Sequence, residues 1–211
     1  MTRFTHSILI LIFSILSVSA QNNTEAQKVI DNLVSSLSTS AIKTNFRLSS
    51  GQKNTVNSQS VSGTFILKGN KFVLDTDGTK AWFDGKTQWT YVADSKEVSV
   101  TEPTESELAD TNPLAILSKF RAKSFIRFSK TKSVANHIIE LNPKSKKEEF
   151  SQVQVQINKA TGNLVSIKLT DKKGSTTLLT LSNYQKGVKV PDNTFVFNKA
   201  NYKGVTINDL R

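Results

Sequence analysis

Hydrophobic and polar residues alternate along most of the chain, and this alternation is typical of β-strands. Between Ser60 and Asp94 the alternation is densest: Val61, Phe65 and Leu67 fall on one face of a first strand. Pairs such as Gly69-Asn70 interrupt it at short intervals, and such pairs favour hairpin turns. The pattern predicts four consecutive antiparallel strands in this stretch, with large apolar groups on one concave face.

The same alternation predicts strands on both sides of this meander. From Gln152 to Asn158, for example, Val153, Val155 and Ile157 share one face and glutamines occupy the other. No composition shift marks a domain boundary, so the strands are expected to form one antiparallel sheet of about ten strands. The other predicted strands are Thr44–Ser50, Glu97–Thr101, His137–Leu141, Leu164–Thr170, Ser175–Asn183, Phe195–Phe197 and Val205–Ile207, and residues 49–59 are expected to form a long hairpin loop.

Two segments have the periodicity of helices instead. From Thr24 to Leu37, apolar residues recur at helical spacing, with Thr24 as the expected N-cap. A shorter helix is predicted from Pro113 to Phe120, because Asn at the N-cap followed by Pro is a favoured helix start. It is too short to be stable alone and must lie on an apolar surface.

These elements indicate a mainly β (α+β) fold. A sheet of this length without a second layer curls, and two layouts fit. In one, the sheet closes into a barrel filled by its own side chains. In the other, it remains an incomplete antiparallel β-barrel, and the helices cover its apolar concave face.

The N-terminus has the features of a secretory signal peptide. Arg3 precedes an apolar run from Ile8 to Leu16, and Val18-Ser19-Ala20 has the small-residue spacing of a cleavage site. Residues 1–20 are therefore expected to be removed, leaving residues 21–211 as a single exported, soluble domain. The chain has no cysteine, which excludes disulfides, thiol catalysis and lipidation of the chain itself as a bacterial lipoprotein.

The formal net charge of +11 suits anionic membrane surfaces, acidic partners or nucleic acid. Export makes nucleic acid an improbable partner, and the lysines are scattered as on a solvated surface. Charge alone does not separate docking from solubility.

Residues suited to catalysis are few. His6 leaves with the signal peptide, so His137 is the one histidine left for a triad, and no Gly-x-Ser-x-Gly element accompanies it. The best carboxylate pair near aromatic residues is Asp84 and Asp94, which are also natural turn residues. We therefore expect no enzymatic activity, no metal and no cofactor.

An apolar concavity with apolar helices, in an exported chain, fits a carrier for lipidic cargo. Burying an acyl chain gains about 0.8 kcal/mol per methylene. A helical lid that fills the same groove in the empty state would offset part of this gain and permit release.

Four segments together carry a resemblance to a known family: GTFILKGNKF (Gly63 to Phe72), DGKTQWTY (Asp84 to Tyr91), NPLAIL (Asn112 to Leu117) and FVFNKANYKGVTINDLR (Phe195 to Arg211). In this order, they resemble the outer-membrane lipoprotein carrier protein family, which is LolA-like. The resemblance implies an incomplete β-barrel with a helical lid. It also implies a monomeric periplasmic protein that takes acylated lipoproteins from an inner-membrane ABC-type release complex and delivers them to an outer-membrane acceptor, whose identity is unknown.

The resemblance also assigns residues. Phe72 corresponds to the aromatic residue of one family element, with Leu74 on the same face. Trp89 and Tyr91 correspond to the family's W-x-Y, and Phe46 corresponds to the aromatic residue of the early strand. The candidate cavity residues are Phe46, Phe65, Leu67, Phe72, Leu74, Trp89 and Tyr91, and the candidate lid residues are Leu114, Ile116, Leu117 and Phe120.

One position departs from the family pattern. Many members have an arginine before a proline in the turn that precedes the aromatic, where it latches the lid. Here the segment reads Leu67-Lys68-Gly69-Asn70, and Lys68 is the candidate latch, although an ammonium lacks the rigid fork of a guanidinium.

Two other functions remain open on the sequence. A periplasmic module that senses lipids or lipoproteins and signals to a protein partner would share the same fold. A hydrolase of envelope polymers would depend on His137 or Asp84.

Overall fold

The computed structural model describes residues 23–51, 59–108 and 112–211. The predicted signal peptide lies outside these residues. Within the described part, a single sheet of 12 strands has the order β12-β6-β5-β4-β3-β2-β1-β11-β10-β9-β8-β7. Neighbouring strands are antiparallel except for β12, which pairs parallel with β6. The two end strands, β12 and β7, do not pair with each other, so the barrel is incomplete, as predicted.

The strands follow the predicted alternation closely, with 12 strands in place of about ten. Strand β1 reaches Gly51 and β2 begins at Gln59, so both strands extend into the stretch expected to be loop. The strands are β1 (Ile42–Gly51), β2 (Gln59–Lys68), β3 (Lys71–Thr76), β4 (Thr79–Phe83), β5 (Gln88–Val92), β6 (Glu97–Thr101), β7 (Ser124–Phe128), β8 (Asn136–Pro143), β9 (Phe150–Asn158), β10 (Leu164–Asp171), β11 (Thr176–Lys186) and β12 (Thr206–Asp209).

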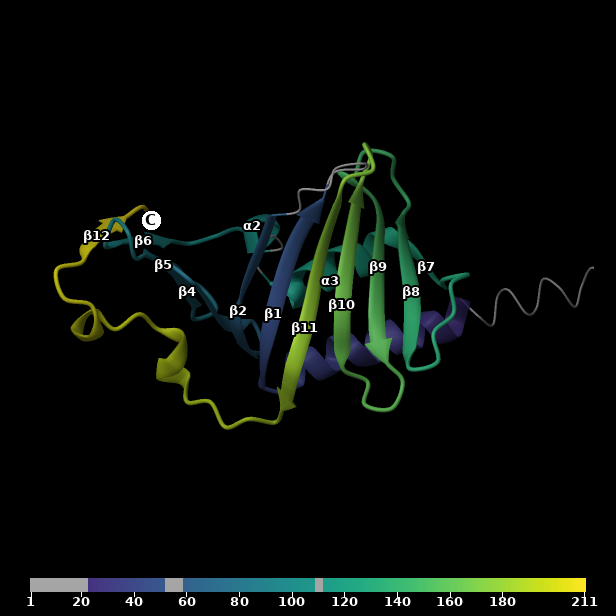
Figure 1. The fold of residues 1–211 in the computed structure, drawn as a ribbon, viewed down its shortest axis with the longest axis horizontal. Coiled ribbons are helices and arrows are strands. Elements are labelled where there is room, and N and C mark those ends of the chain that lie inside the picture. Colours follow the sequence, from purple (N-terminus) through teal and green to yellow (C-terminus); the bar gives the residue numbers. More distant parts are fainter. Residues whose placement is uncertain (1–22, 52–58, 109–111) are drawn as a thin grey trace, which may run out of the picture.

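The helices lie on one face of this sheet. The chain is helical over residues 23–39, and α3 (Pro113–Lys123) follows the short α2 (Glu105–Leu108). Figure 1 shows the N-terminal helix and α3 behind the sheet, on the same side of it. Helix α3 begins where predicted, and the backbone N–H of Ile116 donates to the Asn112 carbonyl at 3.0 Å.

The main core lies between these helices and the concave face of the sheet. Ile30 and Leu37 of the N-terminal helix are buried in it together with Leu117 of α3. From the sheet, β9 contributes Val153 and Val155, whose neighbouring glutamines point away from the core, as the alternation predicted. Each of these fully buried side chains gains about 1.5–3 kcal/mol relative to an exposed position.

A second, smaller core lies on the outer face of β3 and β4. After β11 the chain continues as two short 3₁₀ helices, η1 (Asp192–Phe195) and η2 (Lys199–Asn201), before β12. Phe195 is fully buried there against Val73 and Trp82. The prediction of a strand from Phe195 to Phe197 is wrong, because Phe195 ends a 3₁₀ turn that packs onto the sheet.

Strand β7 was not predicted from the sequence. Its buried residues Ser124 and Ile126 alternate with Phe125 and Arg127, but the surrounding basic run hides this pattern. Because β7 pairs on only one side, with β8, this short strand forms one edge of the sheet.

Candidate functional site

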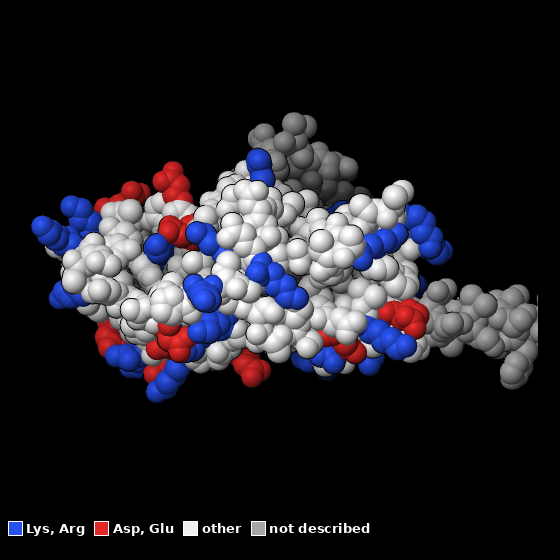
Figure 2. Space-filling model, turned by 90° about the horizontal axis from the view of Figure 1, so that it is seen from below, with Lys and Arg blue, Asp and Glu red and all other residues white. Residues whose placement is uncertain are grey.

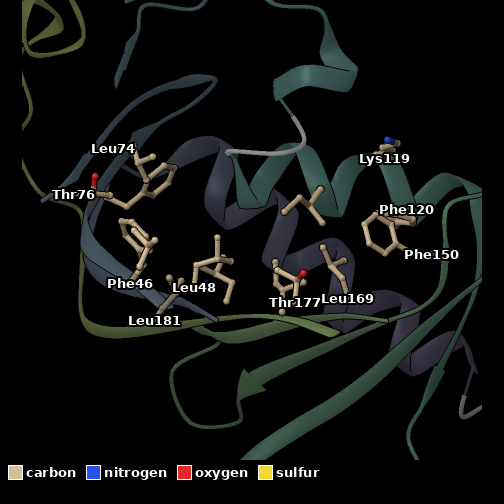
Figure 3. Close-up of a pocket in the computed structure, with 15 residues that line it drawn as sticks. Phe46, Leu48, Leu74, Thr76, Lys119, Phe120, Phe150, Leu169, Thr177 and Leu181 are labelled. Carbon is tan, nitrogen blue, oxygen red and sulfur yellow. The ribbon is translucent and has the colours of Figure 1, made fainter. Parts of the chain in front are cut away.

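An apolar cavity of about 360 Å³ lies between the concave face of the sheet and α3. This volume is within the range of about 300–1,000 Å³ that is usual for small-molecule sites. Figure 3 shows its lining side chains converging from the sheet and from the helix. They are Phe46, Leu48, Val61, Phe65, Leu74, Thr76, Ile116, Lys119, Phe120, Phe150, Ile167, Leu169, Thr177, Leu179 and Leu181.

Strand register builds the wall formed by the sheet. Leu48 of β1 lies opposite Val61 of β2 on one side and opposite Leu179 of β11 on the other. Leu179 in turn lies opposite Ile167 of β10. Because residues directly across antiparallel strands share a face, these four side chains form one continuous apolar row across four strands.

A second row runs parallel to the first. Phe46 of β1 lies opposite Leu181 of β11 on one side and opposite Gly63 of β2 on the other. A Cβ atom at Gly63 would lie 2.9 Å from Cε1 of Phe46 and would collide with the backbone carbonyl of Asp75. A glycine at this point therefore allows the Phe46 ring and strand β3 to approach closely, as the curvature of the wall requires.

The opposite wall comes from α3. Ile116, Lys119 and Phe120 lie on the face of the helix that lines the cavity. The Phe120 ring meets Phe150 of β9 edge-on, with a centroid distance of 5.8 Å and an interplanar angle of 71°. This aromatic contact joins the helix to the sheet at one end of the cavity.

The cavity is open to solvent along part of its wall. Val61 is 51% exposed and Leu48 is 36% exposed, although both belong to the apolar row. Single exposed apolar residues are normal on a protein surface, but a concave group of them marks a binding site. The sheet therefore offers more apolar surface here than the described part of the chain covers.

Three of the predicted cavity residues line this cavity: Phe46, Phe65 and Leu74. Leu67 and Phe72 share their face but are fully buried in the core, where Phe72 contacts Phe65 and Phe83 with centroid distances of 5.9 and 5.4 Å. These two residues support the wall and do not reach the cavity.

Trp89 and Tyr91 lie on the opposite face of the sheet, which corrects their assignment to the cavity. Trp89 pairs with Trp82, and both side chains belong to the outer core that contains Phe195. Tyr91 contacts Tyr202 of the C-terminal segment, with a centroid distance of 4.7 Å. The alternation shows that Trp89 and Tyr91 share a face, but the C-terminal segment that covers this face is distant in sequence.

The predicted lid residues are also divided. Ile116 and Phe120 line the cavity, whereas Leu117 is fully buried in the core. The side chain of Leu114 lies outside the described part of the structure. Helix α3 therefore presents two cavity residues and one core residue on neighbouring turns.

Among the described residues, Lys68 contacts the C-terminal segment and not the lid helix, so its assignment as a latch is wrong. Its ammonium donates to the Val190 carbonyl at 3.0 Å and to Oδ1 of Asp192 at 2.8 Å. Because Lys68 follows Leu67 in β2, it points to the outer face, where it holds the C-terminal segment. These contacts lower the pKa of Asp192, first through the hydrogen bond from Lys68 and then through Lys71.

An ion pair joins α3 to the N-terminal helix instead. Nε of Arg121 lies 2.6 Å from Oδ1 of Asp31, and the Gln27 side-chain amide donates to the same oxygen at 2.8 Å. This arrangement orients Asp31 toward α3. It is a polar contact that ties the cavity-lining helix to its neighbour.

Sequence reasoning missed the part of the wall that comes from β9, β10 and β11. Phe150, Leu169 and Leu179 belong to strands that were predicted from their alternation, but that pattern does not reveal which strands face the helix. The clearest signal was the apolar alternation of Leu179 and Leu181, which matches that of Phe46 and Leu48.

The surface that Figure 2 presents has Lys and Arg side chains spread across it, with Asp and Glu side chains among them. The positive charge on this face is therefore not gathered into one patch. Among the residues that the structure describes, no helix combines the length and apolar character needed to cross a membrane.

Comparison with known families decides the assignment. The model of the family described as outer membrane lipoprotein carrier protein LolA matches residues 16–173. The chain belongs to this family. Membership of the LolA family agrees with the open, mainly antiparallel sheet and the helices on one of its faces, and it confirms the family resemblance. Three of the four segments that carried it lie within the matched residues, and Phe195 to Arg211 lies beyond them.

Curated relatives support the same assignment. An outer-membrane lipoprotein carrier protein of Cupriavidus pinatubonensis is 34% identical over 116 residues, which cover 54% of this chain and 53% of that protein. One of Ralstonia nicotianae is 33% identical over 112 residues, covering 52% and 51%. The chain thus spans about half the length of the curated relatives it matches.

A solved structure shares the fold. An uncharacterized conserved protein from Thermus thermophilus aligns with a TM-score of 0.58 and 12% sequence identity, covering 88% of this chain and 99% of that one. The likeness extends over nearly all of that protein and concerns the fold alone.

The LolA family is a family of carriers, so membership confirms the expectation that the chain is not an enzyme. Asp84 accepts hydrogen bonds from the backbone N–H groups of Lys86 and Thr87 at 2.9 and 2.8 Å, as a turn residue does. His137 lies beside Phe128, and burial together with the positive charge of Lys159 lowers its pKa. In the described part of the chain, no group of three or more metal-ligating side chains occurs.

Proposed function

We propose that this chain is a periplasmic carrier that holds acyl chains of lipoproteins in the cavity beneath α3. The observation that carries the proposal is the row formed by Val61, Leu48, Leu179 and Ile167, an apolar wall that stays partly open to solvent. An acyl chain fits such a wall because it needs no polar partner.

Energetics permit both uptake and release. An acyl chain gains about 0.8 kcal/mol for each methylene that it buries. Part of this gain is offset, because Ile116 and Phe120 of α3 contact the same cavity and lose contacts when the helix moves aside. A carrier needs this balance, since cargo that binds too tightly would not be delivered.

Helix α3 is the element suited to act as a lid. Its contacts with its surroundings include the buried Leu117, the ring contact between Phe120 and Phe150, and the ion pair between Arg121 and Asp31. The chain enters β7 directly after Lys123, so this end of the helix is anchored. We infer that the helix moves about that end when cargo enters.

The partners in this proposal are those that the family resemblance implies. In this proposal the chain is a periplasmic monomer that receives acylated lipoproteins from an inner-membrane ABC-type release complex. It then delivers them to an outer-membrane acceptor that has not been identified.

Cargo uptake from membranes tests the proposal. Purified mature protein is incubated with inner-membrane vesicles that carry a labelled acylated lipoprotein and the release complex. Lipoprotein released into the supernatant is then measured, together with the fraction that co-purifies with the carrier. The proposal predicts release that depends on the carrier. Release that is no greater with the protein than without it would contradict the proposal.

A matched pair of variants tests whether the cavity is responsible. Leu179→Asp places a charge on the apolar row, whereas Leu178→Asp places it one residue away on the outer face, opposite Ser49 and Lys168. Leu179→Asp should abolish uptake and Leu178→Asp should retain it, provided that both variants show the wild-type circular dichroism spectrum. Equal uptake by both variants would rule out the cavity as the cargo site.

A further inference from the structure

One charged side chain lines the otherwise apolar cavity. Among the described lining residues, Lys119 is the only one with an ionisable group, and the remaining polar members are the hydroxyls of Thr76 and Thr177. In Figure 3, Lys119 lies beside Phe120 and Phe150, at the end of the cavity away from Phe46 and Leu74. The cavity therefore has an apolar end and an end that carries a positive charge.

Among the basic residues of α3, which are Lys119, Arg121 and Lys123, Lys119 is the one without an acidic partner in the described part of the chain. Arg121 pairs with Asp31 at 2.6 Å and Lys123 lies 3.9 Å from Glu148. The ammonium of Lys119 instead lies 6.0 Å from the ring centroid of Phe120. A cation over an aromatic ring at the edge of a cavity remains free to pair with an anion that enters.

A second pocket continues the site beyond Phe150. This residue lines the apolar cavity and also a pocket of about 460 Å³. The second pocket contains Lys146 and Lys172, neither of which has an ion-pair partner among the described residues, and Glu148, whose partner is Lys123. Its other lining residues are Pro143, Ser145 and Ser151. The space next to the charged end of the cavity is therefore polar and carries excess positive charge.

We propose that Lys119 is a specificity-determining residue that selects acyl ligands bearing an anionic group. The acyl chain lies along the apolar row, and the carboxylate or phosphate at its head accepts a hydrogen bond from the Lys119 ammonium. A larger head extends past Phe150 toward Lys146 and Lys172. This inference rests on the proposed function, because it concerns the same cavity.

The expected effect is a moderate preference. A charged hydrogen bond at a partly exposed site changes affinity by between about threefold and tenfold. Because the site is open to solvent, added salt should weaken the preference.

The test compares three probes with the same alkyl chain: palmitate, hexadecyl phosphate and the neutral hexadecanol. Each displaces a fluorescent acyl probe from the mature protein, below its critical micelle concentration. Wild-type protein should bind palmitate and hexadecyl phosphate between about threefold and tenfold more tightly than hexadecanol. Using both anionic probes shows whether a carboxylate or a phosphate is preferred.

Variants assign the preference to one side chain. Lys119→Met should bind all three probes as weakly as wild type binds hexadecanol, and Lys119→Arg should retain the preference. Lys132→Met removes an exposed lysine that lines neither pocket, and it should behave as wild type.

The outcomes separate the two proposals. If hexadecanol binds as tightly as the anionic probes, or if Lys119→Met keeps the preference, the inference about Lys119 is wrong and the carrier function stands. If none of the three probes displaces the fluorescent probe, the proposed function fails as well.

Discussion

Nε of Arg121 lies 2.6 Å from Oδ1 of Asp31, so the helix that closes the cavity is tied by an ion pair to the N-terminal helix. Their side chains are 40% and 38% exposed, and a pair of that exposure contributes about 0.2–1 kcal/mol. A contact of this strength can hold a helix in place without preventing its movement.

Breaking this pair should loosen α3. Arg121→Met is expected to speed hydrogen exchange in residues 115–121, because the helix then loses its ion pair with the N-terminal helix. Hydrogen exchange followed by mass spectrometry measures this change. The reversed pair Arg121→Asp with Asp31→Arg should restore slow exchange, and failure of the double variant to do so would show that the ion pair does not hold the helix.

The positions of the two tryptophans give a spectroscopic prediction. Trp82 and Trp89 both belong to the outer core, on the face away from the cavity. A brominated fatty acid, whose bromine atoms quench tryptophan only at short range, should therefore bind without strong quenching. A Phe46→Trp variant carries a reporter in the cavity wall and should be quenched on binding. Strong quenching of the wild-type protein would mean that the ligand binds on the outer face, near the tryptophans, and would contradict binding in the cavity.

Gly63→Ala should destabilise the fold. The added Cβ would collide with the Asp75 carbonyl and crowd the Phe46 ring, and overpacking of this kind costs about 1–3 kcal/mol. Urea unfolding measures the loss. Gly51→Ala is the matched control in the neighbouring strand, since among the described atoms its Cβ would meet only Oγ1 of Thr176, at 3.9 Å. Equal stability of the two variants would mean that the close approach at Gly63 is not required.

The contact between Lys68 and Asp192 predicts a pH dependence. Hydrogen bonds from Lys68 and then Lys71 lower the pKa of Asp192 below its ordinary value of 3.8. A carboxyl group whose pKa is lower in the folded chain stabilises the fold above its unfolded-state pKa, and this stabilisation is lost as the pH falls through the folded-state value. Asp192→Asn should therefore be less stable than wild type at neutral pH and equally stable once the pH is below the folded-state pKa.

Denaturation midpoints of both proteins across this pH range check the prediction. Because the pair ties down the C-terminal segment and not α3, acyl-probe affinity at neutral pH should be the same for both. A stability difference that is constant with pH would contradict the role of the charge. An altered probe affinity would indicate that Lys68 acts on the lid helix after all.

The sequence predicted the architecture well because the alternation of apolar and polar residues is a local property. Phe65 was placed on the concave face because it follows the period of its own strand, and the family resemblance added Phe46 and Leu74. The choice of Asn112-Pro113 as a helix start depends equally on nearest neighbours, and the helix begins there.

What the sequence did not reveal depends on contacts between distant segments. In β3, Phe72 and Val73 are both apolar and face opposite cores, so alternation alone does not say which of the two cores Trp89 of β5 joins. That choice is made by Phe195 and Tyr202 of the C-terminal segment. Lys68 was misassigned for the same reason, since its partner Asp192 lies far along the chain.

The most direct test of the account is to locate a bound acyl chain. A fatty acid with a photoreactive diazirine on its chain is bound to the mature protein, irradiated, and mapped by mass spectrometry of the digested chain. The account predicts cross-links to the cavity wall, at α3 around Ile116 and Phe120 and at β11 around Leu179. Labelling confined to the outer face around Trp89, Tyr91 and Phe197 would contradict it.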